Sequence, residues 1–490
     1  MSAAVRLDRR SDALAALAAV RPAVNVVTEP ERLVAFEMDA YIQKREMPLA
    51  AVLPQSEEQV REVVRAMEKQ GVPVVTRGAG TGISGGATPT AEGVMLVLTR
   101  MRHIVAIDAR SRLATVEPGV PNAQVTDAAS ASRLFFAPDP SSQVVSSIGG
   151  NIAENAGGVH CLKYGLTVHN VVALRVIDGD GELLEIGGES LDSAGFDLLA
   201  VLHGSEGNLG VVTRATLRLL PQPEATETML AAFGSVKAGA EAVGAIIGAG
   251  IIPAAIEMMD RVVIDACERY MALGLPKAEA LLLVEVDGGV EETAEMLGSV
   301  RALLAACGAT EVRVAGNAEE RANLWKSRKG AFAALATVMP DYYTMDGTIP
   351  RRALAEVLES IYALGREYGM VIGNVFHAGD GNMHPCIFYD AAKAGELERS
   401  EELGGKILEL CIDHGGTITG EHGVGIEKLK QMCLQFRDGE IAAFHAVKAA
   451  FDPAGILNPG KAVPTLKRCA EWGGMHVHRG RLPHPDIPRF

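Results

Sequence analysis

The sequence lacks a surplus of positive charge, since its 490 residues contain 46 lysines and arginines against 61 aspartates and glutamates. The formal net charge of −15 gives no positive field for DNA or RNA, so a nucleic acid is not an expected partner. Long apolar runs are also lacking. The least polar stretch, residues 242–256, contains three glycines and Pro253 and is shorter than the roughly 18 residues of a membrane helix. We therefore expect no transmembrane segment.

Cysteine pairs are missing as well, because none of the seven cysteines belongs to a Cys-x-x-Cys pair. Their odd number and irregular spacing indicate reduced thiols in a cytoplasmic protein. The same spacing excludes an iron–sulfur cluster and a c-type haem in this chain. Electrons handled here would have to leave for another molecule. The cysteines are Cys161, Cys267, Cys307, Cys386, Cys411, Cys433 and Cys469.

The first half of the chain has the pattern of a mixed α/β domain. After an N-terminal helical segment, residues 1–48, a strand is expected at 50–53 and a helix at 60–70. Ser56 and Gln59 form a capping box, and Gly71 ends the helix before a strand at 72–76. Further strands are expected at 94–98, 114–116, 171–177 and 211–220, which completes a domain of residues 49–221.

After Pro221 the composition and the expected elements change, which indicates a second domain. Alanine-rich helices at 236–247 and 291–306 alternate with strands at 281–286 and 311–315, as in an α+β domain of residues 222–414. Residues 415–468 are expected to form helical structure that packs on the first domain. The tail comprises residues 469–490.

A glycine-rich loop at 77–86 follows the strand at 72–76 and contains five glycines. Residues 80–85 fit the G-x-G-x-x-G pattern of dinucleotide sites. A Rossmann helix should begin at this loop, but Gly86, Pro89 and Gly93 follow at once, which disfavours a Rossmann fold. The loop is either an anion-binding nest of backbone N–H groups or a flexible surface loop.

Two more loops rich in glycine, asparagine and serine lie in the same domain, at 138–158 and 204–210. Each alone could be an ordinary turn. Together with the loop at 77–86, they suggest that backbone approaches one extended ligand from several sides.

These loops resemble the flavin-binding domain of the vanillyl-alcohol oxidase and p-cresol methylhydroxylase family, in the segments TRGAGTGISGGA, PDPSSQVVSSIGGNIAENAGG and HGSEGNLGVVT. The resemblance implies an α+β fold with a two-part FAD-binding domain of the PCMH type, a substrate (cap) domain and a C-terminal helical segment. Because members with covalent flavin usually carry a histidine in the first loop, which has none here, it implies noncovalent FAD. The FAD contacts that it implies are Arg77, Gly78, Ala79, Gly80, Thr81, Gly82, Gly85, Gly86, Pro138, Asp139, Ser142, Gly149, Gly150, Asn151, Asn155, Gly157, Glu206, Gly210, Val212 and Asn458.

Two histidines flank an Asp-Gly pair between apolar runs at 371–377 and 383–389. Asp-Gly favours a two-residue hairpin turn, which would place His377 opposite His384 with Cβ atoms about 5 Å apart. One metal ion could bridge them, with Glu421 as a third ligand. The alternative is a pair of histidines that merely pack.

Proton chemistry favours the metal. A histidine with a pKa near 6.5 faces a hydroxyl near 16, a gap of roughly 9 units or about 12 kcal/mol. A divalent cation lowers the pKa of bound water by roughly 8 units, which brings an alcohol within reach of a modest base. Concerted hydride loss could replace the metal.

A narrower resemblance is to the FAD-linked D-2-hydroxyacid dehydrogenases, carried by FHAGDGNMH, TGEHGVG and FDPAGILNPGK. It implies that His377, His384 and Glu421 bind a divalent metal, expected to be zinc. It also implies that His422 is the general base and that hydride passes to flavin N5. On the residues alone, His422 could equally be a surface turn histidine.

The same resemblance assigns Arg328 to the substrate carboxylate, for which a guanidinium fork is suited. The alternative is a solvated helix face beside Lys326 and Lys329. Thr344 and Cys386 stand where 2-hydroxyglutarate enzymes carry polar residues for a second carboxylate. A small monocarboxylate, glycolate or D-lactate, is therefore the expected substrate.

The segments DYYTMDGTIPRRAL and CAEWGGMHVHRGRLPHPDIPRF resemble the large FAD-binding subunit of bacterial glycolate oxidases. That likeness implies a second flavoprotein and an iron–sulfur subunit as partners, and a cytoplasmic chain held peripherally at the inner membrane. Tail histidines His476, His478 and His484 would bind metal or belong to a docking strand. The alternatives are a stand-alone D-lactate dehydrogenase with a quinone or cytochrome acceptor, and a non-catalytic flavin-binding subunit. Glu421 and His422 argue against the latter.

Overall fold

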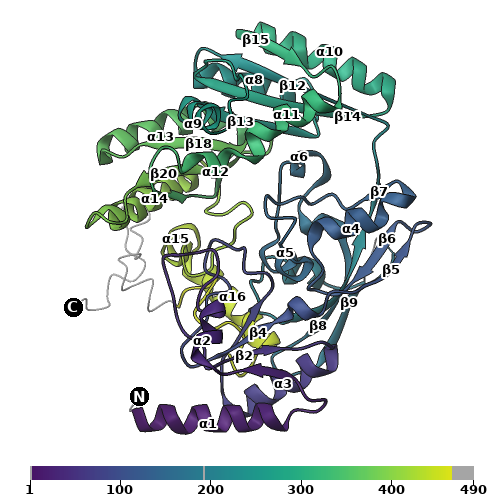
Figure 1. The fold of residues 1–490 in the computed structure, drawn as a ribbon, viewed down its shortest axis with the longest axis vertical. Coiled ribbons are helices and arrows are strands. Elements are labelled where there is room, and N and C mark those ends of the chain that lie inside the picture. The colour runs from purple at the N-terminus through teal and green to yellow at the C-terminus, as the bar shows by residue number, and fades with distance from the viewer. Residues whose placement is uncertain (1–2, 191–193, 466–490) are drawn as a thin grey trace.

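The computed structural model describes residues 3–190 and 194–465, and its ribbon divides into a lower and an upper part (Figure 1). Helix α1 (Ala3–Ala19) lies at the lower edge. It buries Ala13 and Leu17 in one core with Val60, Val63 and Val64 of helix α3 (Glu57–Gln70). The amphipathic N-terminal helix was expected, since its apolar residues recur at helical spacing. Short elements near it are β1 (Asn25–Val27) and α2 (Pro30–Leu33).

The first sheet of the lower part has the strand order β1, β2 (Ala50–Leu53), β4 (Val94–Val97) and β3 (Val74–Arg77). β2 and β3 both run parallel to β4, which lies between them. The βαβ opening therefore exists with a later strand inserted. The expected signals mark both ends of α3. Ser56 Oγ accepts the Gln59 N–H at its start, and Gly71 ends the helix at φ +60°.

The second sheet is antiparallel, with the order β5, β6, β10, β8, β9. In β10 every second side chain is buried, as the Val/Thr/Leu alternation predicts, and the side chains between them are half-buried. Helices α4 and α5 and a small β7–β11 pair complete the second half of this two-part domain. The bounds are β5 (Ile104–Asp108), β6 (Leu113–Val116), α4 (Asn122–Ala129), β7 (Leu134–Phe135), α5 (Ile148–Glu154), α6 (Cys161–Tyr164), β8 (Val171–Ile177), β9 (Leu183–Gly187), α7 (Leu198–Leu202), β10 (Val211–Arg218) and β11 (Leu220–Pro221).

The upper part is built on one large sheet, whose described strand pairs are antiparallel, with helices on both faces (Figure 1). Two separate apolar clusters show this layering, one beneath α8, α10, α13 and α14, the other beneath α9, α11 and α12. The bounds are β12 (Ala225–Phe233), α8 (Val236–Gly248), β13 (Ala255–Asp260), α9 (Arg261–Met271), β14 (Ala280–Gly288), α10 (Val290–Ala306), β15 (Ala309–Val314), α11 (Ala318–Lys329), α12 (Ala331–Leu335), β16 (Asp341–Thr344), β17 (Gly347–Thr348), α13 (Leu354–Tyr368), β18 (Ile372–His377), β19 (Asn382–Met383), β20 (Pro385–Tyr389) and α14 (Glu396–Asp413).

The hairpin that carries the two histidines differs from the prediction. His377 lies opposite Asn382, so the register is shifted by two residues and His377 does not face His384 directly. A four-residue loop, 378–381, replaces the two-residue turn, because Asp380 Oδ1 accepts the Asn382 N–H at 3.0 Å and holds the loop open. A shift of two keeps the strand alternation, so both histidines remain on one face.

After α14 the chain returns to the lower part. A loop leads to α15 (Leu429–Gln435) and α16 (Asp438–Phe451), drawn in yellow in Figure 1. The Asn458 N–H donates to Val74 O at 2.8 Å, and the Gly179 N–H donates to Phe451 O at 2.8 Å. The C-terminal segment is thus fixed to both sheets of the lower part.

Two expectations concern the whole chain. Among the described residues, no helix combines the length and apolar character needed to cross a membrane. The expectation that all cysteines are reduced is wrong, because Cys433 is disulfide-bonded. The free cysteines of the described part are Cys161, Cys267, Cys307, Cys386 and Cys411. Cys469 and the tail histidines His476, His478 and His484 lie outside the described residues.

Candidate functional site

A cavity of about 660 Å³ brings together all three glycine loops of the lower part and side chains of the upper part. Its volume lies within the range of small-molecule and cofactor sites. Thirteen of the residues expected to bind FAD line it: Gly78, Ala79, Gly80, Thr81, Gly82, Gly86, Ser142, Gly149, Gly150, Asn151, Glu206, Gly210 and Val212.

The other expected FAD residues do not line the cavity, and several support its wall from behind. The Arg77 guanidinium packs against Gly80 and donates to Met38 O at 2.7 Å. Asn458 Nδ2 joins two loops by donating to Gly86 O at 2.9 Å and Glu206 O at 2.6 Å. The expected FAD residues that do not line the cavity are Arg77, Gly85, Pro138, Asp139, Asn155, Gly157 and Asn458.

The cavity wall has the space and the free polar groups that a dinucleotide such as FAD needs. A Cβ placed on Gly82 or Gly207 would meet no atom closer than 3.7 Å, so it would occupy room that a ligand can use. Four buried atoms of lining residues have no hydrogen-bond partner among the described residues: Thr76 Oγ1, Ser146 Oγ, Asn151 Nδ2 and Glu154 Oε2. Such groups rarely stay unpaired in a folded protein, so they fit a polar ligand.

The two histidines of the hairpin converge on Glu421 despite the shifted register. His377 Nε2 lies 3.2 Å and His384 Nε2 3.0 Å from Glu421 Oε1. The two rings are 5.2 Å apart and nearly perpendicular, and both histidines are buried. The structure therefore brings together the three side chains that the sequence pattern and the family resemblance select as metal ligands.

The other ring nitrogens explain why a cation fits between these groups. His377 Nδ1 donates to the Glu257 carboxylate at 2.8 Å, and His384 Nδ1 lies 3.3 Å from the Met345 carbonyl. With both protons on Nδ1, each Nε2 directs a lone pair at an acceptor oxygen, which is repulsive unless a proton or a cation lies between. Burial opposes charge on His377, but Glu257 and Glu421 outweigh it and raise its pKa well above the usual value.

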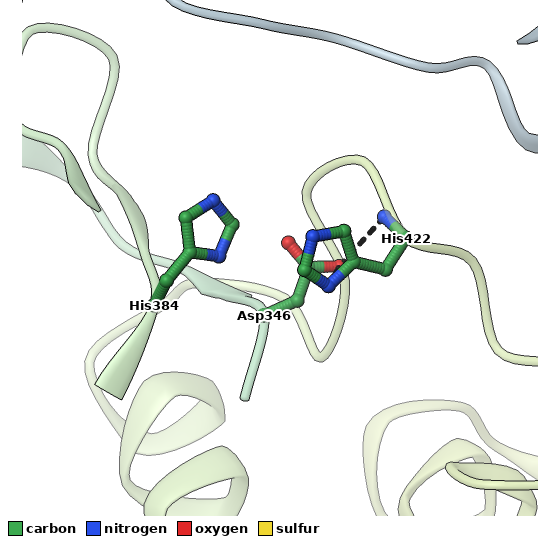
Figure 2. A group of neighbouring side chains, drawn as sticks. All are labelled: Asp346, His384 and His422. Carbon is green, nitrogen blue, oxygen red and sulfur yellow. Dashed lines mark hydrogen bonds and ion pairs between the residues drawn. The ribbon is translucent and has the colours of Figure 1, made fainter. Parts of the chain in front are cut away.

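A second cluster with possible metal-ligand geometry is Asp346, His384 and His422 (Figure 2). The Asp346 carboxylate is already occupied, because it accepts hydrogen bonds from Thr419 Oγ1 at 2.6 Å and from the His422 N–H at 2.9 Å. It also forms an ion pair with the buried Lys428 at 3.1 Å. This carboxylate organises the loop that carries Glu421 and His422, so the trio of His377, His384 and Glu421 is the better candidate for a metal site.

His422 lies at the boundary between the metal-ligand trio and the cavity. Its ring stacks on His384, with centroids 4.8 Å apart and planes at 8°, and it lines the cavity. Burial lowers the pKa of His422 to about 4, against the opposing charge of Asp346. The imidazole is therefore unprotonated at neutral pH and able to accept a proton, which fits its assignment as a base.

Arg328 is 2% exposed, which contradicts the alternative of a solvated helix face. Its Nε donates to Glu257 Oε2 at 2.6 Å, so one carboxylate links Arg328 to His377. One terminal nitrogen has no partner among the described residues, and the guanidinium lies 5.8 Å from the Phe332 ring, which lines the cavity. Arg328 itself is not a lining residue, so its contact with a substrate stays a prediction.

The upper wall of the cavity is mostly aromatic. Phe332, Tyr342, Tyr343 and Tyr389 line it together with Thr344. Thr344 is the cross-strand partner of Cys386, with Oγ1 and Sγ 3.5 Å apart. The two positions expected to discriminate against a second carboxylate are thus neighbours, and they present a hydroxyl and a thiol rather than a cation.

Sequence reasoning missed three acidic residues of the site: Glu257, Asp346 and Glu154. Glu257 and Asp346 are 1% and 0% exposed and hold His377 and the 419–422 loop, respectively. A usable signal existed for Glu257, which is a single charge in the apolar stretch 251–259, where burial is costly without a partner. Glu154 lies within a quoted loop and lines the cavity.

Comparisons with known proteins agree with this geometry. Residues 48–187 match the family model of the FAD binding domain, and residues 222–462 match that of the C-terminal domain of FAD linked oxidases. The chain is 53% identical over 482 residues to the glycolate oxidase subunit GlcD of Escherichia coli (strain K12), covering 98% of this chain and 97% of the relative.

More distant relatives and folds point the same way. The chain is 40% identical to the glycolate oxidase subunit GlcD of Bacillus subtilis (strain 168), over 87% of this chain and 91% of the relative. It is 32% identical to a D-lactate dehydrogenase of Archaeoglobus fulgidus, over 85% and 91%. In fold it is similar to p-cresol methylhydroxylase with bound substrate, at 16% identity and a TM-score of 0.79, with 95% and 98% of the two chains covered.

Proposed function

The chain belongs to the family of FAD-linked oxidases, and from that membership we propose that it oxidises a small 2-hydroxy acid to the 2-oxo acid. The observation that carries the proposal is that Glu421 and His422 line the same cavity as the three glycine loops. A base therefore lies where a flavin and a substrate would meet. FAD, when bound, supplies the acceptor for the substrate hydride at flavin N5.

The cofactor is held noncovalently. The loop at 77–86 contains no histidine, and the described residues that line the cavity include no cysteine and one histidine, His422. That histidine is needed as an unprotonated base. Thr76, Ser146 and Asn151 offer free hydrogen-bonding groups instead.

A divalent cation, expected to be zinc from its nitrogen and oxygen donors, is held by His377, His384 and Glu421. It supplies Lewis-acid chemistry toward the substrate hydroxyl. Glu257 orients His377, and Asp346 holds the backbone of the loop so that Glu421 and His422 face the cavity. His422 takes the hydroxyl proton, since its ring is unprotonated and stacked beside the ligand His384.

The substrate is a small monocarboxylate, with glycolate and D-lactate as the main candidates. Arg328 has a free terminal nitrogen for a carboxylate, and it is preoriented by Glu257. Thr344 and Cys386 provide no cation for a second carboxylate, and the rest of the upper wall consists of four aromatic residues with Pro340 and Asp341. The names of the relatives, glycolate oxidase subunit and D-lactate dehydrogenase, agree with this substrate class.

The name of the bacterial relatives describes a subunit, so the chain is also expected to work with partners. These are a second flavoprotein and an iron–sulfur subunit, which hold a cytoplasmic chain peripherally at the inner membrane. A stand-alone D-lactate dehydrogenase is the second candidate, favoured by the 32% identity to a protein named D-lactate dehydrogenase.

Anaerobic mixing of the purified chain with a panel of 2-hydroxy acids tests the function. Glycolate or D-lactate should bleach the flavin absorbance, whereas D-2-hydroxyglutarate and L-lactate should bleach it much more slowly. His422→Asn should keep FAD and slow bleaching by about 10²- to 10⁴-fold, the usual contribution of a positioned base. Absence of bleaching by every acid of the panel, in protein that contains FAD, would contradict the proposal.

A further inference from the structure

Glu154, the last residue of α5, has a place in the cavity wall that none of the assignments above explains. Its Oε1 would lie 2.8 Å from a Cβ at Gly86 and 3.8 Å from one at Gly82, two glycines of the first loop. On the other side, a Cβ at Gly423 would overlap Glu154 Oε2. The carboxyl group is therefore wedged between the glycine loop and the residue that follows His422.

A second carboxyl group, that of Glu206, lies beside it but is treated differently by the protein. Glu206 accepts the Val424 N–H at 2.7 Å and the Gly425 N–H at 2.6 Å, as a carboxylate anion requires. Glu154 Oε2 is buried and has no hydrogen-bond partner among the described residues. Hydrogen bonds stabilise the charged form of Glu206, and Glu154 Oε2 has none among the described residues. Of these two adjacent carboxyl groups, Glu206 is therefore the anion and Glu154 the neutral acid.

The other charged groups near Glu154 already have hydrogen-bond or ion-pair partners. Lys428 pairs with Asp346 at 3.1 Å, and Lys461 donates to the carbonyls of Gly86, at 2.9 Å, and Thr88. Asp39 accepts the N–H groups of Tyr41 and Ala87. Burial, and then the charge of Glu206, raise the pKa of Glu154 well above its usual value.

We propose that Glu154 is a direct cofactor contact whose neutral carboxyl group donates a hydrogen bond to an acceptor atom of bound FAD. The inference rests on FAD binding, which the proposed function requires. Phosphate oxygens, ring carbonyls and ring nitrogens of FAD all accept hydrogen bonds. An ionised Glu154 would instead place a negative charge beside the loop that is expected to hold the pyrophosphate, and would repel it.

The test is the affinity for FAD, measured from the fluorescence of flavin released on serial dilution of the holoenzyme. Glu154→Ala should weaken binding by about tenfold, the cost of one lost hydrogen bond to a polar ligand. Glu154→Gln, which keeps a neutral donor, should stay within about threefold of the wild type. The matched control Glu58→Gln, an exposed glutamate of the same domain, should not change the affinity.

A pH series separates a cofactor contact from a structural effect. As the pH rises, the wild type should lose affinity for FAD once Glu154 ionises, whereas Glu154→Gln should lose less. Glu427 and Lys461, each with a pKa of about 7, are common to both proteins, so the difference reports on Glu154. Equal affinity in Glu154→Ala and wild type, or equal pH slopes in Glu154→Gln and wild type, would overturn the proposal.

The pH comparison needs only the conservative variant, so it stands even where Glu154→Ala does not fold. Failure of the proposed function has a different signature. A wild type that binds no FAD, or binds it but is bleached by none of the 2-hydroxy acids, contradicts that function. A wild type that bleaches with glycolate or D-lactate, together with variants of unchanged affinity and pH slope, contradicts only the role of Glu154.

Discussion

Glu421 Oε1 lies close to the Nε2 atoms of His377 and His384. The ring protons of these two histidines lie on Nδ1, where Glu257 and the Met345 carbonyl accept them. Sequence spacing and family likeness together were enough to select His377, His384 and Glu421. They were not enough to find Glu257 or Asp346, because these lie far from the trio in sequence and reach it through sheet pairing. At the scale of single residues, the sequence selected the candidate ligands, and the reasoning missed the groups that orient them.

The metal assignment predicts the behaviour of His384→Ala. Removing one ligand leaves His377 and Glu421 to hold the ion, so bound metal should fall well below the wild-type content. Turnover should fall by at least about 100-fold, because even loss of an orienting outer group costs 10- to 100-fold. Elemental analysis and dye reduction measure both effects, while FAD content should remain unchanged.

His103→Ala is a matched control, because it removes an exposed histidine that pairs with Glu117 away from the cavity. It should keep wild-type metal and activity. Full turnover in a wild-type preparation freed of metal would disprove the assignment and favour concerted hydride loss without an ion.

At the scale of elements, the ends of helices were predicted better than the order and register of strands. The cap of α3 at Ser56 and its end at Gly71 follow from side-chain and backbone chemistry within one turn. The position of β4 between β2 and β3 depends on contacts between distant segments, which no local pattern encodes. The hairpin at His377 lies between these cases, since Asp-Gly indicated a turn but the Asp380 side chain widened it by two residues.

A polar network joins α6 and its neighbours in the lower part to β14 in the upper part. His160 lies between two carboxylates, with Nδ1 2.8 Å from Asp139 and Nε2 3.2 Å from Glu285. Tyr164 donates to Asp287 at 2.6 Å. Although burial opposes charge on His160, the two carboxylates raise its pKa well above the usual value.

Stability should therefore depend on pH through His160. A histidine with a raised pKa in the folded state stabilises it fully below the unfolded pKa, near 6.5, and loses this contribution as pH rises through the folded value. The melting temperature of the wild type should exceed that of His160→Gln by roughly 1–3 °C at pH 6. The gap should narrow as the pH rises above 7.

Thermal unfolding from pH 6 to 9.5 measures this gap. His103→Gln provides the control, because the pair of His103 with Glu117 lies within the lower part. A constant difference between wild type and His160→Gln over the whole range would mean that His160 contributes packing and no charge.

At the scale of the whole molecule, the site exists only because three distant segments meet. The glycine loops come from the lower part, the aromatic wall from the upper part, and Glu421 and His422 from the returning C-terminal chain. The family resemblance placed these segments in one site, whereas composition alone predicts only a mixed α/β chain. The shape of the cavity could not be predicted, since it depends on how the two parts pack.

The last prediction concerns the exit of electrons. Oxidation of a 2-hydroxy acid to a 2-oxo acid releases two electrons, and the sequence has no cysteines spaced for an iron–sulfur cluster or c-type haem. The electrons must therefore pass to another molecule, which fits a chain similar to a glycolate oxidase subunit. The isolated chain should reduce an artificial dye with glycolate or D-lactate and react slowly with oxygen.

Deletion of residues 469–490, which lie outside the described residues, should weaken binding of the partner subunits more than it weakens dye reduction. Pull-down of the partners and dye assays on the same preparations compare the two effects. Dye reduction needs only the cavity, whose lining among the described residues comes from segments before residue 469, so it should survive the truncation. Rapid turnover of the isolated chain with oxygen, with stoichiometric release of peroxide, would show a self-sufficient oxidase and would make partner subunits unnecessary for the exit of electrons.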